Sequence, residues 1–178
     1  MVTHEYFRTI DVDFCYIGED INGYCHVLGI RDRFTRYVEA FPTKSTTSAE
    51  FAVHLLAVGG RYGFFEEVCM DNAGYFTSEC IDELLSLMGS KRKRISPYRP
   101  QANPMERSNK DILRNLRALC ACRQEILSEW SSYLPIVLSI INSTFNAVTH
   151  CTPARMMYGD CVDRLRGILL PFGPKLRA

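Results

Sequence analysis

Three carboxylates stand where an α/β fold places reactive groups: Asp11, Asp71 and Glu106. Asp11 lies in the middle of an expected strand, where an acidic residue is disfavoured unless it has a task or an exposed face. Asp71 directly follows the short apolar segment 68–70, and Glu106 lies at the start of an expected long helix. Strand ends beside loops are where α/β sheets place catalytic groups, so these positions are candidates for a shared site.

Two aspartates and one glutamate are suitable ligands for Mg²⁺, which takes carboxylate oxygens together with water and substrate phosphate. Two ions about 4 Å apart activate the attacking oxygen and stabilise the leaving oxygen of an in-line phosphoryl displacement. Carboxylates at such distances repel one another and therefore need cations or raised pKa values. Any one acid, taken alone, is more typical of a cap or a solvated charge; Asp13 and Asp32 are equally acidic, and Asp32 looks like part of a turn.

Charge is unevenly distributed along the chain, although the net charge is only +1. Residues 1–90 carry 6 Lys/Arg and 14 Asp/Glu, whereas residues 91–123 carry 10 Lys/Arg and 2 acidic residues. An acidic half beside a basic segment is expected where carboxylates hold cations next to a polyanion. A solvated run of surface charge explains the same numbers equally well.

The pattern of apolar residues predicts one α/β domain with the element order βββαβαβ followed by helices. Asn22-Gly23 is a hairpin signal between the first two strands, and Thr47 with Glu50 forms a capping box at the first helix. Strands are expected at residues 9–17, 24–30, 36–41 (ended by Pro42), 68–70 and 91–95. Helices are expected at residues 47–60, 79–88, 105–123 and 130–146, with a short one from Thr152.

Length and composition are those of a globular protein that acts inside the cell. The chain has 178 residues, of which 47% are hydrophobic, and it shows neither a membrane-spanning apolar run nor a signal peptide. None of the eight cysteines forms a C-x-x-C pair, so unpaired thiols are favoured over structural zinc. We expect a catalytic core over residues 1–165 and a tail over residues 166–178, where prolines and glycines gather.

Five segments, in order, resemble the integrase core of retroviruses and gypsy-type LTR retrotransposons. They are DRFTRYVEAFP (32–42), MDNAGYFTSE (70–79), SPYRPQANPMERSNK (96–110), EWSSYLPIVLSIINSTFN (129–146) and TPARMMYG (152–159). The resemblance covers roughly residues 8–160. It implies an RNase H-like fold with a five-stranded mixed sheet, three antiparallel strands followed by two more and flanked by helices.

The resemblance also implies a catalytic Asp–Asp–Glu triad that binds two Mg²⁺ or Mn²⁺ ions. That triad corresponds to Asp11, Asp71 and Glu106, with Asp11 preferred to Asp13 because Ile10-Asp11 matches the family's apolar-then-Asp pattern. One departure lies before Glu106: 34 residues separate it from Asp71, where the family usually has about 35. Pro104 stands where the family has a flexible glycine, and the shorter, stiffer loop affects how Glu106 is placed.

A basic helix face and the preceding loop are predicted to contact DNA. Lys110 lies one turn after Glu106, and Arg114 and Arg117 continue that face along a DNA backbone. The remaining candidates for DNA contact surround the start of the same helix: Tyr98, Gln101, Asn103 and Arg107. Loop packing is an equally good interpretation of Tyr98 and Gln101.

The sequence therefore predicts a polynucleotidyl transferase that performs 3′-end processing and strand transfer on DNA. The resemblance implies a homodimer or higher oligomer on paired DNA ends, and nuclear or intracellular location. Neither the family's zinc-binding domain nor its C-terminal DNA-binding domain is recognisable, which suggests a core or a reduced relative. Two alternatives stay open: a domesticated core that binds DNA or protein without catalysis, and an RNase H-type nuclease.

Overall fold

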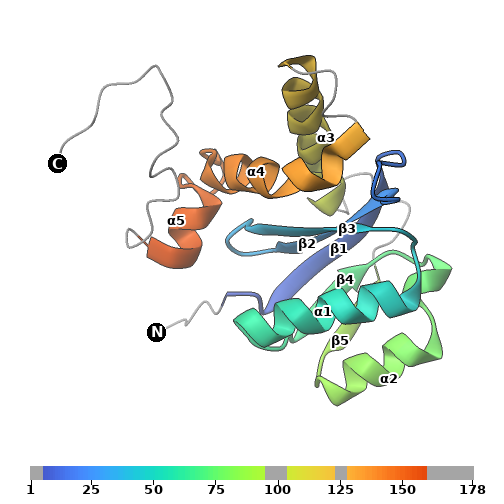
Figure 1. Ribbon diagram of the computed structural model, residues 1–178. Coiled ribbons are helices and arrows are strands. Elements are labelled where there is room, and N and C mark those ends of the chain that lie inside the picture. Colours follow the sequence, from blue (N-terminus) through green and yellow to red (C-terminus); the bar gives the residue numbers. More distant parts are fainter. Residues whose placement is uncertain (1–5, 95–103, 123–127, 160–178) are drawn as a thin grey trace.

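A five-stranded mixed sheet forms the centre of the molecule in the computed structural model, which describes residues 6–94, 104–122 and 128–159 (Figure 1). The strands are β1 (Thr9–Tyr16), β2 (His26–Asp32), β3 (Val38–Thr43), β4 (Glu67–Met70) and β5 (Lys91–Arg94). They lie in the order β3-β2-β1-β4-β5. The first three pair antiparallel, and β4 and β5 continue the sheet parallel to β1. The predicted RNase H-like sheet is confirmed.

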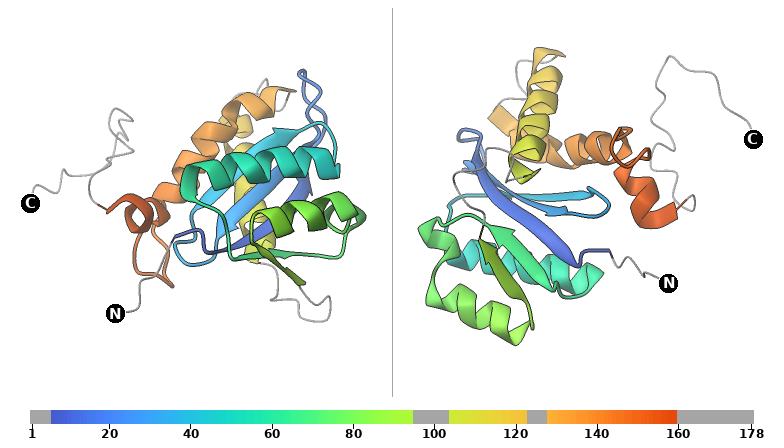
Figure 2. Two further views of the ribbon diagram at one scale, coloured as in Figure 1. Left: turned by 90° about the horizontal axis from the view of Figure 1, so that it is seen from below. Right: turned by 180° about the vertical axis from the view of Figure 1, so that it is seen from behind.

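Helices cover both faces of this sheet. The helices are α1 (Ser48–Tyr62), the 3-10 turn η1 (Gly74–Phe76), α2 (Glu79–Leu87), α3 (Pro104–Cys122), α4 (Trp130–Ser143) and α5 (Pro153–Tyr158). Figures 1 and 2 show α1 and α2 on one face, α3 and α4 on the other, and α5 beyond the end of α4. Every predicted helix is present, with ends that differ from the prediction by a few residues.

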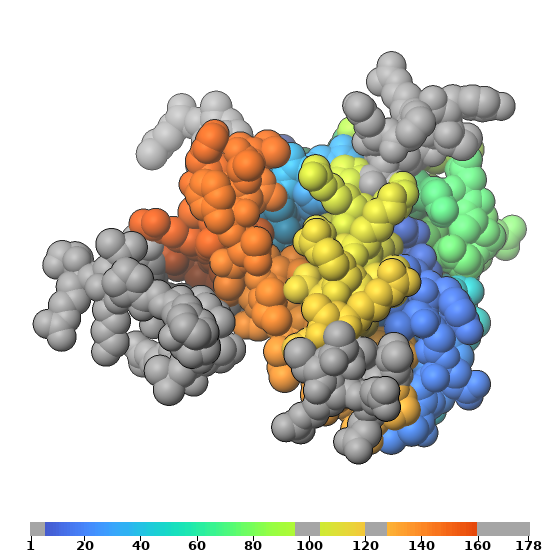
Figure 3. Space-filling model, turned by 90° about the horizontal axis from the view of Figure 1, so that it is seen from above, coloured from blue at the N-terminus to red at the C-terminus, as the bar shows by residue number. Residues whose placement is uncertain are grey.

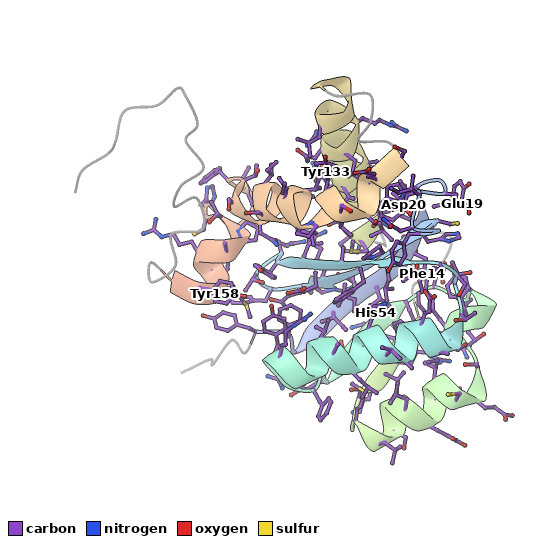
Figure 4. All side chains as sticks on the ribbon, in the orientation of Figure 1. Phe14, Glu19, Asp20, His54, Tyr133 and Tyr158 are labelled. Carbon is purple, nitrogen blue, oxygen red and sulfur yellow. The ribbon has the colours of Figure 1, made fainter. Side chains whose placement is uncertain are left out.

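The alternation of side chains along β1 assigns its residues to the two faces. Ile10 and Val12 are fully buried in the core beneath α1 and α2, and Phe14 packs against it. Figure 4 shows Phe14 between the sheet and α1. Asp11 and Asp13 therefore lie on the opposite face, beneath α3.

The α1 side holds the larger core, which α1 enters through Phe51, Leu55 and Val58, all fully buried. Burial of each such side chain contributes about 1.5–3 kcal/mol. Thr47 caps the helix by accepting a hydrogen bond from the Glu50 backbone nitrogen at 3.3 Å, as the capping box predicts. The helix continues past the predicted end at Gly59-Gly60, because Gly63, with φ of +92°, ends it instead.

On the opposite face, α3 approaches the sheet closely at Gly29 of β2. A Cβ atom at Gly29 would lie 2.1 Å from Cε of Met105, so only a glycine admits the buried Met105 side chain there. Ile112 and Leu116 extend the same stripe of α3 into the core shared with α4. This packing fixes the start of α3 over β1 and β2.

The edge strand β3 is attached to α4 by one side chain. Asn142, 1% exposed, accepts a hydrogen bond from the Val38 backbone nitrogen and donates one to the Val38 carbonyl, each at 2.9 Å. Pro42 was predicted to end this strand but lies inside it, opposite Val27. A proline is tolerated there because an edge strand has a side without ladder hydrogen bonds.

The β1–β2 connection turns at the predicted Asn22-Gly23 and is attached to α4 through Asp20. The carboxylate of Asp20 accepts hydrogen bonds from the backbone nitrogens of Asn22 and Tyr24, both at 2.9 Å, and from the Ser131 hydroxyl. Figure 4 shows Asp20 at this connection, near the α4 residue Tyr133. The loop 96–103 and the predicted boundary at residue 165 lie outside the described residues. Within the ranges described, every helix is too short or too polar to cross a membrane.

Candidate active site

Asp13 and Asp71 come together where β1 and β4 lie side by side. The parallel register aligns Thr9 with Glu67 and Asp11 with Cys69. Two residues further along the same strands, Asp13 therefore lies next to Asp71, which follows the last residue of β4. The Asp71 carboxylate also accepts a hydrogen bond from the Ala73 backbone nitrogen at 3.0 Å, so it is held at the start of the turn that follows.

Asp13 lies in an environment that disfavours its negative charge. Burial and then repulsion by Asp71 raise its pKa from 3.8 to about 6, and repulsion by Glu106 adds a smaller upward effect. The Asn109 side chain of α3 donates a hydrogen bond to Oδ2 of Asp13 at 2.9 Å, which offsets part of this rise. The charge pattern is that of carboxylates assembled around a position for a cation.

Asp11, which the resemblance assigned to the triad, has a different environment: the structure brings Asp13, and not Asp11, beside Asp71. Its side chain is fully buried and accepts hydrogen bonds from both Nε and Nη2 of Arg33. The hydrogen bond with Asp11 raises the pKa of Arg33, so the guanidinium is held charged. The charge of Arg33 thus compensates the Asp11 carboxylate, and Asp13 is the β1 carboxylate that faces Asp71 and Glu106.

Glu106 lies in the first turn of α3, and its side chain does not join those of Asp13 and Asp71. Its side chain is 56% exposed and forms an ion pair with Lys110 one turn later, at 2.8 Å. In the part of the chain that the structure describes, no three His, Cys, Asp or Glu side chains lie close enough together to hold a metal ion. The fit to Mg²⁺ therefore rests on Asp13 and Asp71, whose carboxylate oxygens are ligands of the right kind.

The predicted DNA-binding residues of α3 divide between two sides of the helix. Lys110 lies beside Glu106, and Arg117 is exposed further along. Arg107 and Arg114 instead line a cavity on another side, where Arg114 forms an ion pair with Asp111. The remaining candidates fall in a segment outside the described residues: Tyr98, Gln101 and Asn103.

Two residues that were not predicted from the sequence determine the different environments of Asp13 and Asp11. Asn109 orients Asp13, and its spacing of three residues from Glu106 is a signal that points it toward the same site. Arg33 neutralises Asp11, but the sequence pattern suggested no more for it than a turn after the second strand. The distinction depends on which residues lie opposite one another in neighbouring strands.

Retroviral polyproteins are similar to this chain in sequence. The chain is 31% identical over 151 residues to the Gag-Pol polyprotein of Feline leukemia virus and 30% identical over 149 residues to the Pro-Pol polyprotein of Simian foamy virus type 3. These matches cover 84% and 81% of the chain. The chain spans 9% and 12% of the length of the two polyproteins. No protein-family model matches the sequence.

Solved structures of integrases have the same fold. A chain of a simian T-cell lymphotropic virus intasome, solved in complex with the PP2A regulatory subunit B56 gamma, matches 98% of this chain and 57% of its own length, with a TM-score of 0.75 and 17% identity. The catalytic core domain of BIV integrase matches 84% of this chain and 93% of its own length, with a TM-score of 0.67 and 20% identity. The resemblance to the integrase core is thereby confirmed.

Proposed function

Because the chain belongs with the retroviral polyproteins in sequence and with the integrase catalytic core in fold, we propose that it is the catalytic core of a retroelement integrase. It acts as a polynucleotidyl transferase, using Mg²⁺ or Mn²⁺ in 3′-end processing and strand transfer. The observation that carries the proposal is the placement of Asp13 beside Asp71, where burial and then repulsion by Asp71 raise the pKa of Asp13 to about 6. Repulsion between two carboxylates destabilises a fold unless a bound cation offsets it.

The residues that would hold the metal are Asp13, Asp71 and Glu106. A bound divalent cation supplies charge stabilisation and makes water or a DNA 3′-hydroxyl a better nucleophile. Asn109 donates a hydrogen bond to Oδ2 of Asp13, which orients the carboxylate. Lys110 places positive charge beside Glu106, where the scissile DNA backbone is expected to lie.

The proposal includes partners that match this chemistry. DNA, both the element ends and the target, is the substrate, and the core works as a homodimer or higher oligomer. The protein acts on chromosomal DNA, in the nucleus or elsewhere inside the cell. Residues 1–165 form the core in this proposal.

Joining of short duplex DNA ends to a target duplex, with and without Mg²⁺ or Mn²⁺, tests the function. The protein should form joined product only with a divalent ion, and Asp71→Asn should lower that rate on the order of 10³-fold, because a metal ligand is lost. Glu79→Gln in α2 is the matched control: it removes one exposed acid and should leave the rate unchanged. Full activity of Asp71→Asn would contradict the proposal.

Two further arms separate the other candidate functions. Cleavage of an RNA–DNA hybrid, without joining of DNA ends, would identify an RNase H-type nuclease. DNA binding without any metal-dependent product would identify a core that binds but does not catalyse. The exposure of the Glu106 side chain favours this second candidate, because among the described residues Glu106 does not form a three-carboxylate group with the two aspartates.

A further inference from the structure

A cavity of about 340 Å³ lies between α3, the segment that follows α4, and the β2–β3 turn. Figure 3 shows strand residues in light blue at this place, between α3 in yellow and the orange segment. Arginines contributed by β2, by the β2–β3 turn and by α3 line it: Arg31, Arg36, Arg107 and Arg114. The side chains of Val38 and Phe145 add apolar wall. Its volume falls within the range of small-molecule sites, about 300–1,000 Å³.

Positive charge in this cavity is poorly compensated. Asp111 is the one acidic side chain among the described residues that line it, and its carboxylate is bound by Arg114 at 2.9 Å. Arg31 donates one hydrogen bond, from Nη1 to the Pro104 carbonyl, which attaches it to the start of α3. Two further guanidinium groups, those of Arg36 and Arg107, face the same space without a carboxylate of their own in the described lining.

Two of these arginines carry buried donors that no group in the described chain satisfies. The Nε atoms of Arg31 and Arg36 are buried and have no hydrogen-bond partner. Arg31 is 7% exposed, and burial, then repulsion by Arg36 and Arg107, lowers its pKa to about 10. Buried donors without acceptors are costly, so the described chain itself leaves these two guanidinium groups incompletely satisfied.

We propose that this cavity binds a phosphate group. A phosphate carries up to two negative charges and at least three acceptor oxygens, which matches three guanidinium groups better than the single charge and two oxygens of a carboxylate do. The site is separate from the candidate active site: Arg107 follows Glu106 in sequence, but it lies about a quarter-turn further round α3. The face of α3 that reaches Asp13 carries Asn109 instead.

Isothermal titration with tripolyphosphate, without divalent metal, tests the site. The unmodified protein should bind the probe saturably, and Arg36→Gln and Arg107→Gln should each weaken binding about tenfold, since each loses charge-assisted hydrogen bonds. Arg61→Gln is the matched control, because it removes the same charge from α1 on the other face of the sheet. Its affinity should stay within about twofold of the unmodified protein.

Thermal melting of each variant shows that it is folded. Arg107 is exposed on α3, so Arg107→Gln gives a valid result even if Arg36→Gln does not fold. Absence of saturable binding would overturn the proposal. Equal losses in Arg107→Gln and Arg61→Gln would also overturn it, because the effect would then be general surface charge.

Fluorescence anisotropy with a short duplex DNA identifies the source of the phosphate. If the group belongs to DNA, tripolyphosphate displaces the duplex, and Arg36→Gln weakens duplex binding by the factor that it weakens binding of the probe. If the group belongs to a free small molecule, duplex binding persists at saturating tripolyphosphate and is unchanged in Arg36→Gln. Either result supports a phosphate site. Because no metal or joined product is measured, failure of this test leaves the catalytic proposal unaffected.

Discussion

Two aspartates on the same face of β1, two residues apart, have opposite electrostatic environments. Asp11 is fully buried and bound by Nε and Nη2 of the Arg33 guanidinium. Asp13 is half-buried, receives neutral hydrogen bonds from the Asn109 side chain and the Phe14 backbone, and is repelled by Asp71 and Glu106. Both residues are aspartates on the same face of β1, so their neighbours determine the difference between them.

This difference separates a structural carboxylate from a reactive one. A buried acid with a cationic partner gains nothing from a metal ion, because its charge is already compensated. An acid that its neighbours push toward the neutral form gains charge compensation when a cation binds. The distinction predicts different consequences for the same substitution at the two positions.

The largest expected effect is on catalysis. Asp13→Asn should lower the metal-dependent rate of DNA joining on the order of 10³-fold, since a proposed metal ligand is removed. Asp11→Asn, compared per folded molecule at low temperature, should keep the rate within about tenfold. Single-turnover joining assays measure both rates. If Asp11→Asn is the inactive variant and Asp13→Asn is active, Asp11 and not Asp13 is the catalytic carboxylate.

The next effect is on stability. Asp11→Asn should lower the free energy of unfolding by about 3 kcal/mol, because it leaves the Arg33 charge without its partner. The loss lies at the lower end of the range for buried pairs, since the Arg33 side chain is 36% exposed. Urea unfolding of Asp11→Asn, Arg33→Met and the double variant measures the coupling. A loss below about 1 kcal/mol would show that the pair is not a structural element.

A third effect depends on pH. The folded-state pKa of Asp13, about 6, lies above its ordinary value of 3.8, so ionisation of Asp13 favours the unfolded state. In the metal-free protein, the contribution of Asp13 to the free energy of unfolding is fully present below about pH 4 and is lost as the pH rises through 6. Asp13→Asn should therefore match the unmodified protein at pH 4 and exceed its stability by about 3 kcal/mol at pH 8. Urea unfolding across this range, without and with Mg²⁺, measures the difference; a constant difference would show that Asp13 does not titrate there.

The smallest effect is expected beside Glu106. Lys110→Ala should change stability by less than about 0.5 kcal/mol, because the Lys110–Glu106 ion pair is exposed on both sides. It should nevertheless lower the slope of log affinity against log salt concentration for DNA binding by about 1, which corresponds to one phosphate contact. Lys44→Ala, in the connection between β3 and α1, is the control and should leave the salt dependence unchanged. An identical slope for both variants would remove Lys110 from the DNA-binding surface.

Most of the fold was predictable because its signals are local. The alternation along β1, the Asn22-Gly23 turn and the cap at Thr47 each depend on a few neighbouring residues, and each prediction is confirmed. The positions of Asp71 and Glu106, at the end of β4 and the start of α3, were predicted for the same reason.

The choice between Asp11 and Asp13 was not predictable from local pattern. Both lie on one face of β1, and the register with β4 decides which of them meets Asp71. That register joins segments nearly 60 residues apart, and no nearby residue encodes it. The position of Arg33 next to Asp11 depends likewise on the pairing of β1 with β2.

The hydrogen bonds of Asn142 have a consequence for how the molecule behaves in a crowded solution. Edge strands invite pairing with strands of other molecules, which leads to aggregation. At Val38 the outward N–H and C=O of β3 are already occupied by the Asn142 amide, which imitates a neighbouring strand at that residue. The opposite edge, β5, consists entirely of Lys and Arg residues, of which Arg92 and Lys93 form ion pairs with Asp82 and Glu67. Charged side chains on an edge strand disfavour pairing with a second strand. Among the described residues, a side chain thus protects one edge of the sheet at Val38, and charged side chains protect the other.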